Sequence, residues 1–371
     1  MPEAAADQIE LNGFNGIRFW GDASPRTILP IVRVSARKAG FGLMPPAVSS
    51  RASFNFLAIS GGSEDGAFGA GLLTGWSAAG TRPSFDVVTG VSSGALMAPF
   101  AFLGAGYDRQ LREIFTRYGR KDIFNYNVRG ALGGYALADN RPLESLIASY
   151  VDDAFLEEIA RERLKGRVLL IGTTNLDAQR PVMWDMGKIA ATGGAEAKLL
   201  FRKILLASAT LPGVFPPVRI QVRVSGKDFD ELHVDGGVTR QVFVAPAIMS
   251  SFQADQMHGA AVQRRLYVIR NGKIDPEWQS VDEEILSVTV RSVSTLIKNQ
   301  GIGDLYRIHA IARHEGIDFN LAGIPADFRY KADGPFDRSY MIALFDYGYS
   351  LAARGYSWIK APPGLELRPK L

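Results

Sequence analysis

Short apolar runs alternate with longer segments of helical periodicity from residue 54 onward. The runs are rich in β-branched and aromatic residues and end at glycine, proline or polar clusters, which indicates buried strands. In the longer segments, apolar residues recur at the spacing of a helix that covers one face of a sheet. Alternating strands and helices predict an α/β protein. Strands are expected at 54–60, 85–89, 168–174, 181–186, 218–224, 231–234 and 266–270, and helices at 67–79, 95–103, 107–118, 141–165 (two), 195–209, 278–312 (one or two, with a break at 301–303) and 340–358.

The first 50 residues lack this periodicity. Residues 17–22 have the composition of a short strand, and four prolines interrupt the remainder. We expect residues 1–50 to form an extended arm that packs over the core; the alternative is a partly disordered tail. Because the chain contains no repeat, low-complexity tract or linker, residues 51–371 are expected to form one domain.

One predicted strand leads directly into a serine flanked by glycines. The strand at 85–89 is followed by Gly90-Val-Ser-Ser-Gly94 and then by good helix formers. This order is typical of a nucleophile elbow, in which the two glycines avoid collisions at a sharp, strained turn. The Ser92 hydroxyl would then lie at a helix N-terminus, where backbone amides favour developing negative charge. Ser93 falls one place off the motif, and the alternative for the pentapeptide is an ordinary tight turn.

Two further stretches supply groups that such an elbow needs. A strand ends at Ser60 and Gly61-Gly62-Ser63 follows, so amides of this loop can point outward and bind an oxyanion. Farther along, Val234-Asp235-Gly236-Gly237 places an acid at a strand end. The two glycines allow that loop to turn sharply and to approach another loop closely.

These motifs, in this order, resemble those of the patatin-like phospholipase family. A fourth match, Ala207-Ser-Ala-Thr-Leu-Pro-Gly-Val-Phe-Pro-Pro, precedes the acid, so the resemblance covers about residues 54 to 240. It implies a three-layer α/β/α fold with a mainly parallel sheet. It also implies a lipid acyl hydrolase of the phospholipase A, lysophospholipase or esterase type, with a Ser–Asp dyad and without histidine.

By this resemblance Ser92 is the nucleophile, Asp235 is the base, and Gly61, Gly62 and Ser63 form the oxyanion hole. Gly90 and Gly94 shape the elbow, and Gly236 and Gly237 follow the acid. A carboxylate is a weak base, so the dyad depends on burial to raise the pKa of Asp235. Two positions depart from the family pattern: Ser63 replaces the usual third glycine, and Asp65 stands where a basic residue is common.

Other interpretations remain open at this point. An α/β-hydrolase triad runs in the order Ser, acid, His, and His258, His309 and His314 all follow Asp235. His233 would share a strand face with Asp235 and is either a neighbour of the dyad or a histidine bonded to backbone. A non-catalytic lipid-binding module is the third alternative, supported by Ser63 and Asp65. The irregular stretch 119–139, with Phe124, Tyr126 and Tyr135, is either a lid or lipid-facing loop, or a plain surface loop.

The amino-acid composition excludes several kinds of catalytic and metal-binding site. The 371 residues include no cysteine, which excludes disulfides, thiol nucleophiles and thiolate metal sites. The four histidines lack the spacing of a zinc site, and the loop at 61–66 lacks the Lys and Ser/Thr of a P-loop, so we expect no metal and no cofactor. The net charge of +4 is spread along the chain without basic runs. This charge distribution gives no sign of a nucleic acid partner, and it is compatible with peripheral membrane contact. The resemblance implies an acyl-lipid substrate such as a phospholipid; the oligomeric state stays open.

The same sequence also predicts the compartment of the protein and its relation to the membrane. The first residues lack the charged and apolar regions of a secretory signal peptide. This favours a cytoplasmic or peripheral-membrane protein, unless the chain is a trimmed form of an exported one. The uncharged window 87–107 contains the elbow, several glycines and a proline, so it is interpreted as a buried strand and core helix rather than a membrane span.

Overall fold

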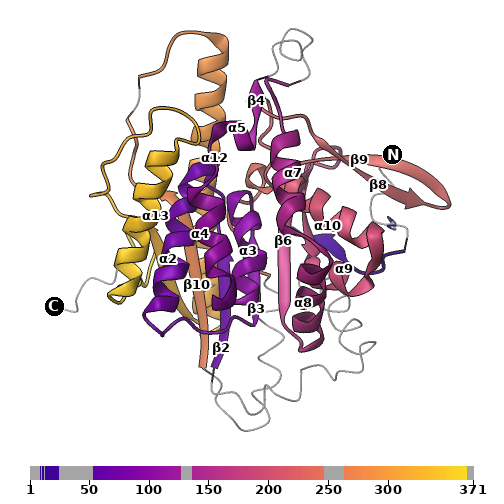
Figure 1. Cartoon of the computed structure of the whole chain (residues 1–371), viewed down its shortest axis with the longest axis horizontal. Helices are drawn as coiled ribbons and strands as arrows, with labels where there is room; N and C mark the ends of the chain where they lie inside the picture. The colour runs from indigo at the N-terminus through magenta and orange to yellow at the C-terminus, as the bar shows by residue number, and fades with distance from the viewer. Residues whose placement is uncertain are drawn as a thin grey trace.

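The computed structural model describes residues 9, 11, 13–24, 53–126, 136–245, 263–278 and 280–365. Within these residues, the centre of the main sheet is parallel, in the spatial order β6, β3, β2, β10, β11 (Figure 1). Antiparallel strands extend it beyond β6, where β7 and then β1 pair, and β9 pairs with the end of β6 and with β8. The strands of this sheet are β1 (Arg18–Trp20), β2 (Ser53–Ile59), β3 (Val87–Gly90), β6 (Val168–Asn175), β7 (Arg180–Asp185), β8 (Val218–Val224), β9 (Lys227–Asp235), β10 (Gln263–Lys273) and β11 (Asp318–Ile324).

Helices on both faces of the sheet make the fold a three-layer α/β/α arrangement. On β2, Leu57 and Ile59 belong to the core under most of the helices, whereas Phe54, Phe56 and Ala58 belong to the core under α12. This alternation follows from the two-residue period of a strand whose two faces are both buried. The helices are α2 (Gly66–Ala78), α3 (Ser93–Leu103), α4 (Asp108–Thr116), α5 (Arg120–Ile123), α7 (Arg141–Tyr150), α8 (Asp153–Leu164), α9 (Met186–Thr192), α10 (Gly194–Ser208), α12 (Ile285–His314) and α13 (Arg338–Ala353).

Glycines in α2 allow close packing against two different neighbours. Gly69 faces β10, where a Cβ would lie 2.4 Å from Asn271 Oδ1. A Cβ on Gly71 would instead lie 2.0 Å from the carbonyl oxygen of Phe345, in α13. Gly71 therefore permits backbone contact between two helices.

The short helices α5 and α9 were not predicted, and three further differences concern α12, β11 and β1. Helix α12 is continuous through 301–303, where a break was expected, because the helix packs there against the acid-bearing loop described below. Strand β11 was not predicted, since a short apolar run directly after a long helix gives no separate signal. The segment at 17–22 adds strand β1 to the sheet edge by pairing with β7, so it extends the sheet rather than lying over it. Residues 1–8, 10, 12 and 25–50 of the predicted arm lie outside the described residues.

The uncharged window 87–107 forms β3 and α3, as predicted. No helix in the described part of the chain is long and apolar enough to span a bilayer.

The parallel strands bring the candidate site residues to one edge of the sheet. The carboxyl ends of β2, β3 and β10 share this edge, which is where open α/β sheets bind ligands. The loop at 61–63 follows β2, and Ser92 follows β3. Strand β9 approaches from the antiparallel side and pairs Asp235 with Thr173 near the end of β6.

Candidate active site

Ser92 occupies a strained turn between β3 and α3. Its backbone has φ 55° and ψ −127°, a positive φ that residues with a side chain rarely adopt. A Cβ on Gly90 would lie 2.4 Å from the carbonyl oxygen of Gly94, and one on Gly94 would lie 2.5 Å from that of Ser60. The Ser92 amide donates a hydrogen bond to Ser208 Oγ at 3.0 Å. The local geometry is that of a nucleophile elbow, with Ser92 directly before helix α3.

Asp235 ends strand β9 and faces Ser92. The Ser92 hydroxyl lies close enough to the Asp235 carboxylate to lower its pKa, and the Gly237 amide donates a hydrogen bond to Oδ1 at 2.7 Å. Asp235 is 5% exposed, and burial raises the pKa of this carboxyl to about 6, although Ser92 and the Gly237 amide act to lower it. A carboxylate with a pKa this close to neutrality accepts a proton more readily than an ordinary aspartate does.

The loop after β2 lies against Ser92. A Cβ on Gly61 would come 2.7 Å from Ser92 Cβ. The Gly61 amide donates to the carbonyl oxygen of Gln241 at 3.1 Å, so this amide already has a partner. Gly62 and Ser63 lead into the short turn η3 (Ser63–Asp65), where the first amides of a helical turn are left without intrahelical acceptors. Ser63 has φ 50°, so the loop places a serine in a left-handed conformation that glycine adopts more easily.

Asn271, at the end of β10, fastens this loop from the sheet side. Its backbone amide donates to Ser60 Oγ and its side-chain amide donates to the Ser60 carbonyl, both at 2.8 Å. Its Oδ1 accepts from the Gly69 amide in α2 at 3.1 Å. The Asn271 carbonyl oxygen lies 1.9 Å from where a Cβ on Gly62 would be. Asn271 was not among the predicted site residues, and the available signal was an amide side chain directly after the predicted strand at 266–270.

Gln241 lies between the loop at 61–63, named the oxyanion loop after its predicted role, and the loop that follows Asp235. A Cβ on Gly61 would lie 2.8 Å from Gln241 Oε1, and a Cβ on Gly237 would lie 2.5 Å from it. The backbone amide of Gln241 donates a hydrogen bond to Oδ2 of Asp304, in α12, at 2.8 Å. Burial raises the pKa of Asp304 to about 6. Gln241 and Asp304 were also missed, because their role depends on contacts between distant parts of the chain.

Two acidic residues follow the oxyanion loop directly. The Tyr340 hydroxyl, from α13, donates to Asp65 Oδ1, while burial raises the pKa of Asp65 to about 7. Burial also raises the pKa of Glu64. Where the resemblance leads one to expect a basic side chain, the structure therefore has a half-buried acid that accepts a hydrogen bond from a tyrosine.

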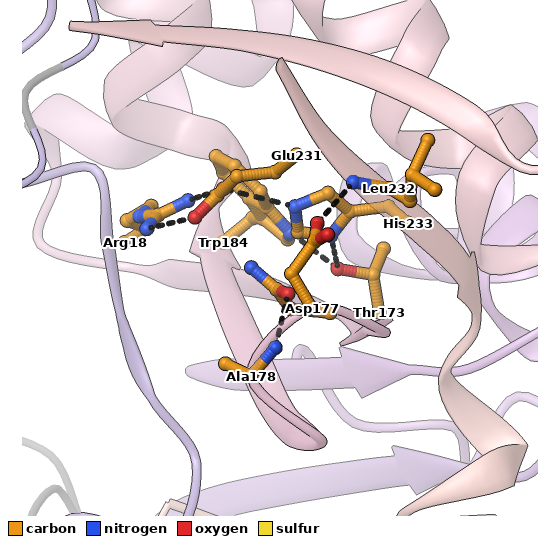
Figure 2. A network of polar contacts seen from close by, with 9 residues as sticks. Arg18, Thr173, Asp177, Ala178, Trp184, Glu231, Leu232 and His233 are labelled. Atoms are coloured by element: carbon orange, nitrogen blue, oxygen red, sulfur yellow. Dashed lines mark hydrogen bonds and ion pairs between the residues drawn. The ribbon is translucent and has the colours of Figure 1, made fainter. Parts of the chain in front are cut away.

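His233 belongs to a buried polar network beside Asp235 (Figure 2). Its Nδ1 lies 3.0 Å from Thr173 Oγ1, and its Nε2 lies 3.1 Å from Glu231 Oε2. The Trp184 indole donates to Thr173 Oγ1 at 2.8 Å, and Arg18 pairs with Glu231 at 2.5 Å. Because both ring nitrogens contact side chains, His233 is not the backbone-bonded histidine that the sequence favoured, and neither nitrogen is left for Ser92.

His309 and His314 belong to helix α12. His309, in α12, packs its ring against Phe319 with centroids 5.1 Å apart, and His314 ends the same helix. Within the described residues, no hydrogen bond joins a histidine to Ser92 or Asp235. His258 lies outside those residues. The described part of the chain also contains no group of three or more His, Cys, Asp or Glu side chains placed to hold a metal ion.

The irregular stretch at 119–139 has mixed exposure. Phe124 is buried in a small apolar cluster with Ala138 and Phe215, whereas Tyr126 is 62% exposed. Tyr135 lies outside the described residues. Phe124 is therefore not the exposed aromatic that the sequence suggested.

A model of the patatin-like phospholipase family matches residues 57–248. The chain belongs to the patatin-like phospholipase family. The match contains the loop at 61–63, Ser92 and Asp235. Membership in this family implies a lipid acyl hydrolase that acts on lipid substrates.

A comparison with solved structures found VipD from Legionella pneumophila, which is similar over 82% of this chain and 67% of that one. The TM-score is 0.39 and the sequence identity is 10%. None of the curated proteins compared with this chain matches it.

Proposed function

We propose that this patatin-like protein cleaves carboxylic esters of lipids through an acyl-enzyme formed on Ser92, with Asp235 as the base. The observation that carries the proposal is the position of Ser92, at its strained turn, next to a buried carboxyl whose pKa its hydroxyl lowers. The family match supports an acyl lipid as the substrate.

In this mechanism Asp235 takes the Ser92 proton while Oγ attacks the ester carbonyl carbon. The tetrahedral intermediate then collapses, and the leaving alcohol departs with that proton. A water molecule, deprotonated by Asp235, attacks the acyl-enzyme and releases the fatty acid. The pKa of about 6 supports both roles, because the carboxylate is ionised at neutral pH and still basic enough to accept a proton.

The oxyanion donors in this proposal are the amides of Gly62 and Ser63. The Gly61 amide is bonded to Gln241, so Gly61 acts through its small size beside Ser92. Each oxyanion donor contributes on the order of 3 kcal/mol to transition-state stabilisation. Contacts from Asn271 hold the loop before substrate arrives, so little reorganisation is needed during the reaction.

A fluorophosphonate probe and a p-nitrophenyl ester test the proposal together. The probe should label Ser92 and not Ser93, and Ser92→Ala should abolish both labelling and hydrolysis while circular dichroism stays unchanged. His309→Ala and His314→Ala serve as matched controls and should keep most of the activity. Retained hydrolysis in Ser92→Ala would refute the nucleophile. Loss of activity in either histidine variant would favour a Ser–Asp–His triad, and lipid binding by the wild type without any hydrolysis would favour a binding module.

A further inference from the structure

Helix α12 extends past the edge of the sheet that carries the proposed active site. It connects β10 to β11, two parallel strands, so the helix begins at the carboxyl edge of the sheet and runs back across it. Its 30 residues span about 45 Å at the rise of an α-helix. The 11 residues of β10 span only about 36 Å. Figure 1 shows the first part of α12, in orange, projecting beyond the labelled strands of the sheet and the helices beside them.

This projecting part exposes large apolar side chains. Ile285 is 89% exposed, Leu296 is 70% exposed and Val288 is 48% exposed. On a helix with 3.6 residues per turn these three residues fall within a sector of about 80°, and Arg291 lies outside it. Trp278, in the segment between β10 and α12, is 91% exposed. Apolar side chains gathered on one projecting element indicate an interaction site rather than ordinary surface scatter.

The projecting part is joined rigidly to the active-site edge. Farther along α12, Asp304 accepts a hydrogen bond from the Gln241 amide, next to the oxyanion loop. Toward the projecting end, Lys298 donates to the Asp275 carbonyl and to Glu277, which fixes the segment that carries Trp278 alongside the helix. The exposed apolar residues are therefore held beside the site that would receive substrate.

We infer that Trp278 and the first half of α12, with Ile285, Val288 and Leu296 on its surface, form a docking element for an electrically neutral lipid surface. This inference rests on the proposed lipid hydrolase function, because a lipid surface is the source of that substrate. Tryptophan and aliphatic side chains on a partly polar helix are the composition of elements that lie in a membrane interface.

Charge favours a zwitterionic surface over an anionic one. The residues just before the helix, Asp282, Glu283 and Glu284, are acidic, and Arg291 and Lys298 do not outnumber them. Binding should therefore depend on apolar burial and change little with salt. A second copy of the chain is a weaker occupant, because a stable dimer buries roughly 800 Å² per partner, more than these four side chains supply.

The test uses the Ser92→Ala protein, so that binding is measured without hydrolysis, and phosphatidylcholine vesicles. Trp278 fluorescence should shift to the blue on vesicle addition, and the protein should float with the vesicles at low and high salt. The double variant Ile285→Ser/Leu296→Ser should lower partitioning at least about tenfold, since each exposed side chain contributes more than a factor of ten when fully buried. Leu164→Ser is the matched control, because Leu164 is 53% exposed and precedes β6 at the opposite edge of the sheet.

In the active protein, the same double variant should slow phospholipid hydrolysis in vesicles about tenfold and leave hydrolysis of soluble p-nitrophenyl butyrate unchanged. Absence of vesicle binding, or equal binding by the double variant and Leu164→Ser, would overturn the inference. A concentration-dependent dimer that the double variant abolishes would overturn it in favour of a second copy. If vesicles bind through this element but no ester is hydrolysed, the docking element stands and the proposed hydrolase function fails.

Discussion

Replacing Asp235 with asparagine should remove activity and, at the same time, stabilise the protein at alkaline pH. The pKa of this carboxyl rises from 3.8 to about 6 on folding, so the folded state disfavours the ionised form. Well below pH 3.8 the carboxyl is protonated in both the folded and the unfolded state and does not affect the free energy of folding. As the pH rises through 6, its unfavourable contribution to that free energy grows to its full value. A shift of this size corresponds to up to about 3 kcal/mol. Asparagine carries no charge and can still accept from Gly237 and donate to Ser92, so the variant should gain most of this free energy.

The assay is urea unfolding of the wild type and Asp235→Asn at pH 8 and pH 5. The gain in the free energy of unfolding should be larger at pH 8, by about 1 kcal/mol or more. Glu231→Gln, on the same strand, is the control with the opposite sign. Burial acts to raise the pKa of Glu231, but hydrogen bonds from His233 and Arg18 bring it down to about 2, so its charge stabilises the fold at both pH values. A destabilised Asp235→Asn at pH 8, or a gain independent of pH, would refute the reasoning that burial makes Asp235 a competent base.

Three further predictions concern the base and the oxyanion loop. In the wild type, kcat/KM should fall below about pH 6 with a single-proton limb, because only ionised Asp235 accepts the Ser92 proton, and a limb near pH 4 would contradict this. Gly62→Ala should lower kcat/KM on a p-nitrophenyl ester at least about a hundredfold, since its Cβ would lie 1.9 Å from the Asn271 carbonyl and the loop must move by about 1 Å or more. Ser63→Gly should change kcat/KM less than about tenfold, because glycine adopts φ 50° freely. A near-normal Gly62→Ala enzyme, with folding checked by circular dichroism, would place the donors elsewhere.

The fold was predictable where local sequence carries the signal. Strand β3, the glycines around Ser92 and helix α3 form a local pattern, and the structure has these elements within a few residues of the prediction. The predicted break in α12 was wrong because glycine costs a helix only about 1 kcal/mol, which tertiary packing can offset. Gly301 packs between Arg270 and Gln241, and no local pattern reveals that contact.

The hydrogen bonds that hold the candidate site in place could not be predicted from local sequence. Ser208 contacts the Ser92 amide from the end of α10, and Asn271 reaches the oxyanion loop from β10. Each of these polar residues stands in a segment that otherwise serves the core. Their roles arise when the sheet brings distant segments together, and a single sequence does not specify which segments meet.

The two buried carboxylates of β9 explain why the proposed Ser–Asp dyad can dispense with the nearby histidine. Trp184 Nε1 can only donate, so Thr173 Oγ1 accepts from it and gives its own proton to His233 Nδ1. His233 must then donate from Nε2 to Glu231, whose charge Arg18 balances. This series of hydrogen bonds uses both ring nitrogens of the neutral imidazole. Burial also lowers the pKa of His233, so the histidine is poorly placed to take up a further proton. Asp235, four residues along the same strand, has a serine and an amide as partners instead of a cation, and burial therefore raises its pKa toward neutrality. The strand thus separates a structural acid, kept ionised by arginine, from an acid whose affinity for a proton suits it to act as the base.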